Sequence, residues 1–398
     1  MRNVGTVVRG IRTPIIKEGA DLANIVVDSL LTASKSENFE LEDKDVVAIT
    51  EAVVGISEGN FATLDQIAKD IKVKLNNPDH IGLVFPILSR NRFAVLLSAM
   101  ARSTKKITLM SSYPSDEVGN DILYTDDLIK YGVNPSSDII SEEEYKEKFI
   151  HFKHLFTGVN MYEVYRDLVL KEGCEFEMVF SNNPCDILKY TNTVIACDIH
   201  TRELTKNRIL KHNENAVVIT LDNILNASVD GSGYSPYGLL GSNRSTEEKV
   251  KLFPRTGNEL VNNIQNILKE KTGKTIEVMV YGDGAFKDPV GKIWELADPV
   301  VSPAYTSGLE GSPNEIKLKY FSENKFKDLN GKELDEAMRE EIKAKDKELK
   351  GSMATQGTTP RRYTDLLGSL CDLTSGSGDK GTPVVLVQRY FTNYSLFQ

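Results

Sequence analysis

The sequence predicts a two-domain protein of mixed α/β structure. Its 398 residues exceed the roughly 250–300 at which a single hydrophobic core stops growing. Hydrophobic residues make up 40% of the chain and charged residues 26%, so disorder of the whole chain is not expected. Between residues 78 and 214, short apolar strands alternate with helices, which is typical of a parallel sheet covered on both faces. We expect this stretch to be a separate α/β lobe.

Composition and charge exclude several classes of protein. The formal net charge of -9 rules out a generally basic surface, and the sequence contains no local basic patch of the kind that binds DNA or RNA. No stretch approaches the roughly 20 apolar residues of a membrane helix, and residues 1–13 lack the apolar core of a signal peptide. Four cysteines without a C-x-x-C pair favour reduced thiols. We therefore expect a cytoplasmic protein without nucleic-acid or membrane partners.

The first 77 residues are predicted to alternate strands and helices. Leu22, Ile25 and Leu30 recur at helical spacing after the turn at Thr13-Pro14, and a β-branched run from Asp45 predicts a buried strand. The expected elements are a strand at 4–8, a helix at 21–34, a strand at 45–50, a loop or short strand at 51–59 and a helix at 60–72.

The lobe from 78 to 214 has its own regular order of elements. Strands are expected at 80–88, 106–111, 175–180 and 193–197, helices at 91–103, 142–155 and 161–171, and a helical turn after Pro184. Because apolar strands of this kind are buried on both faces, the sheet should be parallel.

The remaining chain returns to strands and helices around glycine-rich loops. We expect a strand at 215–221, a loop at 230–243, a helix at 258–271, a strand at 275–281, an exposed charged helix at 335–349, a flexible hinge at 351–360, a helix at 363–373 and a strand at 383–387.

Two aspartates are candidate metal ligands. Asp230 and Asp283 each follow an apolar stretch and lie among glycines. Carboxylates in such loops can approach a hydrated Mg²⁺ together with its phosphate ligands. The alternative is that each aspartate stabilises a turn through its own backbone, as Asp-Gly pairs commonly do.

Standard phosphate-binding and nucleophile motifs are missing from the sequence. It contains no G-x-x-x-x-G-K-[ST] and no G-x-S-x-G, and Gly231-Ser232-Gly233 lacks the third glycine of a dinucleotide fingerprint. Cys174, Cys185, Cys197 and His200 lie within one lobe, but their spacing fits no standard zinc pattern. Buried strand cysteines with a surface histidine are the better interpretation.

A pair of arginines marks a second candidate site. Arg90 and Arg92 lie where a strand is expected to end and a helix to begin, the edge at which parallel sheets bind ligands. They could bind a carboxylate or a phosphate. A capped helix start with solvated arginines is the equally weighted alternative.

Five segments, in order, resemble the coenzyme F420-0:L-glutamate ligase (gamma-glutamyl ligase) family. Together they span about half the chain, within residues 1–75, 215–310 and 360–390. Ile15 to Leu22 is similar to I-K-E-G-D-D-L, Asp45 to Gly59 to D-V-L-V-V-T…S-K-A-E-G, Asn226 to Asp230 to N-A-G-V-D, Asp283 with Gly291 to Trp294 to D-T-x-G-R-P-W, and Asp379 to Val387 to D-E-G-I-P-V-V-L-V.

The resemblance implies a fold, an activity and a set of ligands. It implies an α+β core made of residues 1–77 and 215–398, with 78–214 as an inserted α/β lobe, and a homodimer. It implies a ligase that uses GTP or ATP and divalent metal (Mg²⁺ or Mn²⁺) to join L-glutamate, or another amino acid, to an acid through an acyl phosphate.

The same resemblance assigns roles to individual residues. Asp230 and Asp283 would bind metal, and the nucleotide would lie against Ile15 and Ile16, with Lys17 nearby. Gly233 and Ser377 fall where the family has an asparagine and a metal-binding glutamine.

Two further family positions also differ, since Gly284 replaces a threonine and Ile56 a lysine. Several polar family residues are thus replaced by small or apolar ones. Glutamylation of a folate-type cofactor and a non-catalytic descendant that binds a nucleotide or another small ligand therefore stay open as alternatives.

Overall fold

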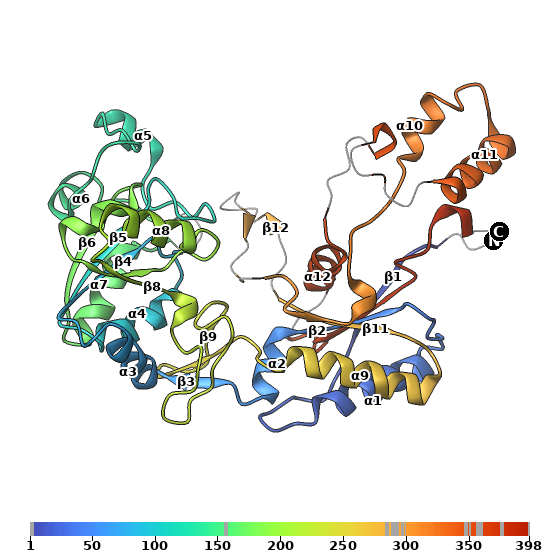
Figure 1. Ribbon diagram of the computed structural model, residues 1–398, viewed down its shortest axis with the longest axis horizontal. Coiled ribbons are helices and arrows are strands. Elements are labelled where there is room, and N and C mark those ends of the chain that lie inside the picture. The colour runs from blue at the N-terminus through green and yellow to red at the C-terminus, as the bar shows by residue number, and fades with distance from the viewer. Residues whose placement is uncertain are drawn as a thin grey trace. The chain divides into compact units, whose positions relative to one another are not determined.

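The structure is a computed structural model that describes residues 4–154, 158–282, 286–287, 294–295, 298, 300–345, 349, 352–355, 361–374 and 378–396. Its contacts divide the chain into two compact units (Figure 1). The first unit comprises residues 1–54, 256–284 and 301–398, and the second comprises residues 55–255 and 285–300. None of the described helices is long and apolar enough to cross a membrane.

The first unit is built on a mixed five-stranded sheet. The strands β2 (Val46–Thr50) and β11 (Glu277–Tyr281) are parallel, and the other neighbours are antiparallel. The strand order is β1 (Val7–Ile11), β15 (Val384–Gln388), β2, β11 and β14 (Ala304–Tyr305). Every residue of β2, β11 and β15 is buried, which explains their continuous apolar runs.

Helices cover both faces of this sheet (Figure 1). On one face, α1 (Leu22–Ser36) and α9 (Gly257–Thr272) bury Val26, Leu30 and Ile264 against the strands. On the other face, α12 (Tyr363–Thr374) buries Leu367 and Cys371. Further helices complete the unit, namely η3 (Ser307–Leu309), α10 (Leu318–Glu323), α11 (Gly331–Ala344), η4 (Met353–Thr355) and η5 (Tyr394–Leu396).

The second unit contains an all-parallel five-stranded sheet, as the sequence predicted. Its order is β6 (Glu175–Phe180), β5 (Lys106–Ser111), β4 (His80–Val84), β7 (Thr193–Ala196) and β8 (Val217–Thr220). The chain adds β5 and β6 on one side of β4, and then β7 and β8 on the other. This reversal between β4 and β7 is the topological switch point of a doubly wound sheet.

Helices also cover both faces of the parallel sheet, which confirms the predicted layering. The helices α3 (Leu64–Lys74), α4 (Phe93–Ala101) and α7 (Met161–Lys171) pack on one face, and η1 (Pro184–Lys189) and α8 (Arg202–His212) pack on the other. Further short elements are α5 (Thr125–Lys130), α6 (Glu142–Lys148) and η2 (Leu221–Asn223). The helix expected at 142–155 thus ends earlier, at Lys148.

Residues 51–72 differ from the sequence expectation. The stretch predicted as a loop or short strand is the helix α2 (Glu51–Ser57), which begins in the first unit and ends in the second. The helix expected at 60–72 begins only at Leu64, because Phe61–Thr63 forms β3 and pairs with β10 (Lys249–Lys251). A capping box between Thr63 and Gln66 fixes this start.

Two small sheets complete the second unit. One consists of β3, β10 and β9 (Asn243–Arg244), and the other pairs β12 (Phe286–Lys287) with β13 (Trp294–Glu295).

In the first unit, the helix predicted at 335–349 corresponds to α11, which begins four residues earlier than predicted. Most of the hinge predicted at 351–360 lies outside the described residues.

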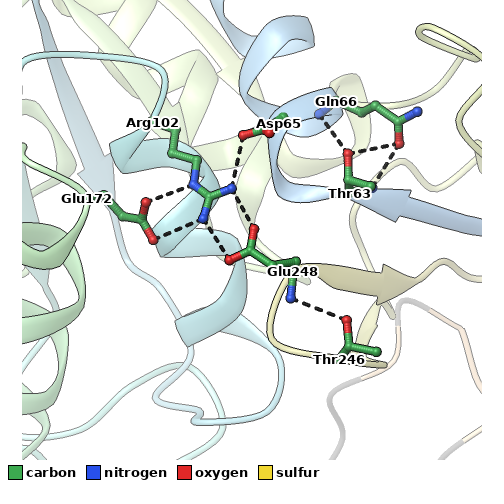
Figure 2. A network of polar contacts seen from close by, with 7 residues as sticks. All are labelled: Thr63, Asp65, Gln66, Arg102, Glu172, Thr246 and Glu248. Atoms are coloured by element: carbon green, nitrogen blue, oxygen red, sulfur yellow. Dashed lines mark hydrogen bonds and ion pairs between the residues drawn. The ribbon is translucent and has the colours of Figure 1, made fainter.

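The second unit extends beyond the predicted lobe of residues 78–214 at both ends. An ion-pair network explains part of this extension (Figure 2). Arg102, at the end of α4, pairs with Glu172 at 2.8 Å, Glu248 at 2.7 Å and Asp65 at 3.0 Å. Glu248 and Asp65 lie outside 78–214, so they fasten flanking segments to the lobe. That residues 78–214 form an insertion stays a prediction.

Candidate functional site

Several chain segments meet at one edge of the mixed sheet in the first unit. The strands β1, β2 and β11 run in the same direction, and Ile11, Val384, Ile49 and Val280 lie in one row across the sheet. Just beyond this row, the Thr50 N–H donates to the Pro383 carbonyl at 3.0 Å. The ends of three strands and the beginning of β15 therefore share this edge.

Polar groups are concentrated where β2 and β11 end. Thr50 and Glu51 are buried at the junction of β2 and α2. The Tyr281 hydroxyl, at the end of β11, is buried without a well-formed hydrogen bond in the described part of the chain, and burial raises its pKa. The chain continues from Tyr281 to the predicted metal ligand Asp283, which lies outside the described residues.

A cavity of about 1260 Å³ lies in the same unit, beside β1 and α1. Arg9, Arg12 and Lys380 are the cations of its wall. Arg9 donates to Gln388 Oε1 at 2.5 Å and lies over the Phe39 ring. Arg12 and Lys380 are exposed and have no ion-pair partner among the described residues. Hydroxyl groups also line the cavity, from Thr13, Ser29, Thr32, Ser36, Thr374 and Thr382.

The predicted nucleotide-binding segment continues directly from the cavity wall at Pro14. Ile15 is 90% exposed. Ile16 packs partly against the core of α1 and α9, and Lys17 is exposed. Asp21 then caps α1 by accepting the Asn24 N–H at 3.3 Å. Ser377, the last residue predicted to contact cofactor, lies outside the described residues.

Asp230 lies in a turn of the second unit. Its backbone has a φ of 47°, its side chain is 57% exposed, and its carboxylate pairs with Lys69 Nζ at 2.5 Å. The Asp230 carbonyl also accepts from Gln66 at 3.1 Å. Within the described ranges, no three His, Cys, Asp or Glu side chains gather closely enough to hold a metal. A metal at Asp230 would therefore depend on water, phosphate oxygens or residues outside these ranges.

Gly233 has a clear packing role. Its N–H donates to the Phe61 carbonyl at 2.7 Å, and a Cβ at this position would lie 2.3 Å from Asn60 Oδ1 and 2.8 Å from the Phe61 nitrogen. The close approach of two backbones thus requires glycine here. This explains why the asparagine expected from the family pattern is replaced.

The two arginines near the switch point differ in environment. Arg90 is exposed, whereas Arg92 is half-buried and pairs with the buried Asp298 at 2.7 Å. Arg92 also borders a small, mostly apolar hollow of about 40 Å³ near the ends of β4 and β7. The Arg92 N–H donates to Ser89 Oγ at 2.9 Å, but no side-chain hydrogen bond caps the first turn of α4, so the predicted capped helix start is not found.

The cysteines fit the interpretation as buried strand residues only in part, because Cys174 and Cys197 lie just outside β6 and β7 and Cys185 lies in η1. Cys174 and Cys197 are buried, Cys185 is half-buried and His200 is exposed. Burial raises the pKa of the Cys174 thiol to about 11, which keeps it protonated near neutral pH. No metal-binding cluster forms from these side chains in the part of the chain that is described.

Sequence reasoning missed three acids at the carboxyl edge of the parallel sheet. Asp116 accepts from Leu88 N at 2.8 Å and from Val118 and Asn120, while Glu117 accepts from three consecutive N–H groups at residues 199–201. Asp198 accepts from Thr201 and Thr205 through Oδ2, and its buried Oδ1 has no hydrogen bond to any described residue. Leu88 and residues 199–201 are distant in sequence from Asp116 and Glu117, so no local pattern reveals those contacts, whereas the partners of Asp198 are local.

The first unit thus combines a mixed sheet with a cavity whose wall carries Arg9, Arg12 and Lys380 as well as the acids Asp28 and Glu37. A family model described as F420-0:Gamma-glutamyl ligase matches residues 10–389. The chain therefore belongs to the F420-0:gamma-glutamyl ligase family, and the match extends well beyond the five segments that first indicated it. The matched range includes residues 78–214. No curated protein matches the chain.

Proposed function

We propose that this protein is an amide-forming ligase that joins L-glutamate, or another amino acid, to a carboxylate substrate at the expense of GTP or ATP. Family membership supports the glutamyl-ligase chemistry. The observation that carries the nucleotide part is the cavity beside residues 15–22, in which Arg12 and Lys380 have no ion-pair partner among the described residues. Uncompensated cations with neighbouring hydroxyls favour a phosphorylated ligand.

The proposed reaction has two balanced steps. A carboxylate oxygen of the acid attacks the γ-phosphorus, and the bond to the nucleoside diphosphate breaks with its electron pair. The amine of the amino acid then attacks the acyl carbon, an amide bond forms, and phosphate leaves with the C–O electron pair while the amine loses a proton. A divalent metal would neutralise phosphate charge, and Asp230 and Asp283 are the residues proposed to hold it.

The chain's own side chains would supply binding and orientation. Arg12 and Lys380 would contact phosphoryl oxygens. The exposed Ile15 would cover an apolar face of the nucleotide. Since Lys69 occupies the Asp230 carboxylate, metal binding there would compete with this ion pair.

Glutamate-dependent phosphate release tests the proposal. The protein is incubated with GTP or ATP, Mg²⁺ or Mn²⁺, L-glutamate and a panel of acids that includes a deazaflavin-type and a folate-type acid. We expect phosphate release and a product heavier than one acid by a glutamyl residue. Asp230→Asn and Asp283→Asn should each abolish both signals. A nucleotide that neither binds nor is hydrolysed with any acid would refute the ligase.

A non-catalytic ligand-binding protein is the second candidate, and Gly233 favours it. The backbone contact at Gly233 excludes the polar side chain of the family pattern, and Asp230 is already paired with Lys69. This candidate predicts that GTP or ATP raises the melting temperature, while no acid elicits phosphate release. Size-exclusion chromatography with light scattering tests the homodimer, which we also propose from the family resemblance.

A further inference from the structure

Arg255 is held in a fixed orientation by neutral groups of the second unit. Its Nη1 donates to Asn60 Oδ1, and its Nη2 donates to the Glu58 carbonyl at 3.1 Å. The Glu58 carboxylate accepts the backbone N–H of Arg255 at 3.0 Å. Neither oxygen that receives the guanidinium belongs to a carboxylate.

Asn60 anchors this arrangement. It is fully buried, its Nδ2 donates to the Phe253 carbonyl at 2.8 Å, and its Oδ1 also accepts the Tyr234 N–H at 3.0 Å. Because all these contacts are to backbone or to Arg255, Asn60 has little freedom to rotate. The close backbone approach at Gly233 brings Tyr234 into this position.

An aromatic ring completes the surroundings of Arg255. The guanidinium carbon lies 5.4 Å from the centre of the Tyr234 ring, which is 40% exposed. A ring in this position favours the cation without neutralising its charge. Arg255 itself is half-buried, so its charge is partly desolvated.

The guanidinium of Arg255 forms no ion pair within the described residues, and three of its five N–H donors have no hydrogen-bond acceptor there. A guanidinium held by neutral acceptors is preorganised to receive an oxyanion through its remaining donors. By contrast, Arg102 and Arg92 of the same unit both form ion pairs with carboxylates.

We propose that Arg255, oriented by Asn60 and Tyr234, is a substrate-binding residue that contacts an oxyanion, a phosphoryl or carboxylate group, of a ligase substrate. This inference rests on the proposed function and deepens it, since it assigns a binding role to a residue of the second unit. The two sources of the oxyanion are the nucleotide and the amino acid, and the test distinguishes them.

Arginine modification in the wild-type protein is the first test. Phenylglyoxal is added to the full chain alone, with GTP or ATP plus Mg²⁺, or with L-glutamate, and modified arginines are mapped by mass spectrometry. We expect at least one of these ligands to slow modification of Arg255 by tenfold or more. Arg208, which is exposed and has no ion pair within the described residues, is the internal control and should react equally in all samples.

Two variants provide the second test. Arg255→Gln should weaken binding of the protecting ligand by at least tenfold, Arg255→Lys should weaken it less, and Arg208→Gln should leave it unchanged. A KM effect much larger than the kcat effect separates binding from a structural loss. Protection by nucleotide assigns a phosphoryl group, and protection by glutamate alone assigns a carboxylate.

The outcomes separate this inference from the proposed function. If a nucleotide binds but neither it nor glutamate protects Arg255, the Arg255 inference is wrong and the ligase proposal stands. If no nucleotide binds while glutamate protects Arg255, the ligase proposal fails and the oxyanion site stands. Equal affinities of wild-type protein and Arg255→Gln for the protecting ligand would also overturn the inference.

Discussion

The two five-stranded sheets differ in how the polar groups at their strand ends are used. At the carboxyl edge of the parallel sheet, Asp116 and Glu117 are saturated by N–H groups of neighbouring loops. Near the corresponding edge of the mixed sheet, Arg12 and Lys380 have no ion-pair partner among the described residues. Both edges are positions at which α/β sheets commonly bind ligands. A position at a sheet edge therefore indicates a binding site only where the polar side chains do not already form hydrogen bonds or ion pairs within the protein.

Removal of an acid whose oxygens already accept several hydrogen bonds should cause the largest loss of stability. Asp116→Ala leaves four N–H donors without their acceptor, and we expect a loss of about 4 kcal/mol from the free energy of unfolding. Urea unfolding, followed by hydrogen exchange in β5, measures this loss. Asp167→Ala, which removes an exposed carboxylate from α7, is the control and should change stability by less than about 0.5 kcal/mol. A similar result for both variants would contradict the comparison.

Crowding of the close backbone contact at Gly233 should cause the next largest loss of stability. Gly233→Ala places a methyl group 2.3 Å from Asn60 Oδ1, and overpacking of this kind costs about 2–3 kcal/mol. Gly231→Ala in the same loop has open space around it and only a positive φ of 76°, so it should cost about 1 kcal/mol. Thermal unfolding of both variants separates crowding from backbone strain. Equal costs would mean that the loop at 231–233 can move away from Asn60.

The Arg102 network should have a smaller and salt-dependent effect. Three carboxylates hold the pKa of Arg102 above its usual range, but Asp65 and Glu248 are largely exposed, so solvent screens them. We expect Arg102→Met to cost about 2 kcal/mol at low salt, mostly through the half-buried Glu172. Repeating the unfolding in 1 M NaCl should shrink the difference from wild type. No change with salt would indicate that packing, and not charge, explains the network.

A substitution at Asp198 should stabilise the protein, in contrast to the preceding variants. Burial raises the pKa of its carboxyl, and the neighbouring Glu117 raises it further. A raised carboxyl pKa favours the folded state at low pH, and this contribution is lost as pH rises above about 4. Asp198→Asn keeps the acceptor for Thr201 and Thr205, so it should stabilise the protein by about 1 kcal/mol at pH 8 and flatten the pH profile. A destabilised variant at pH 8 would show that the charge of Asp198 is compensated.

The strands and helices of the parallel sheet were predicted well because each is specified by residues close together in the sequence. The strands at 106–111 and 175–180 and the helix at 161–171 agree with the structure to the residue, since each is a short run with its own periodicity. Residues 51–63 could not be predicted in this way. The pairing of β3 with β10, nearly 190 residues later, overrides the helical pattern that begins at Asn60.

The candidate site shows the same limit. The segment at 15–22 and the aspartates at 230 and 283 were found from motif resemblance, which is local in sequence. Arg9 and Lys380 become neighbours in one cavity only because β1 pairs with β15, in which Leu386, the partner of Arg9, lies 377 positions further along the chain. Asn60 and Arg255 likewise meet only in the folded chain. Such pairs leave no signal in a single sequence.

The uncommitted cations of the mixed-sheet edge should give the smallest change in stability and a clear change in binding. Arg12→Gln with Lys380→Gln removes two exposed charges that have no ion-pair partner in the described part of the chain, so the free energy of unfolding should change by less than about 0.5 kcal/mol. If these side chains contact phosphoryl oxygens, the same double variant should weaken GTP or ATP binding by tenfold or more, as titration calorimetry would measure. The acids of the parallel sheet should behave in the opposite way, with large losses of stability and no direct effect on nucleotide affinity. A double variant that unfolds more easily by over 1 kcal/mol, yet binds nucleotide normally, would mean that Arg12 and Lys380 are structural and that the two edges do not differ in kind.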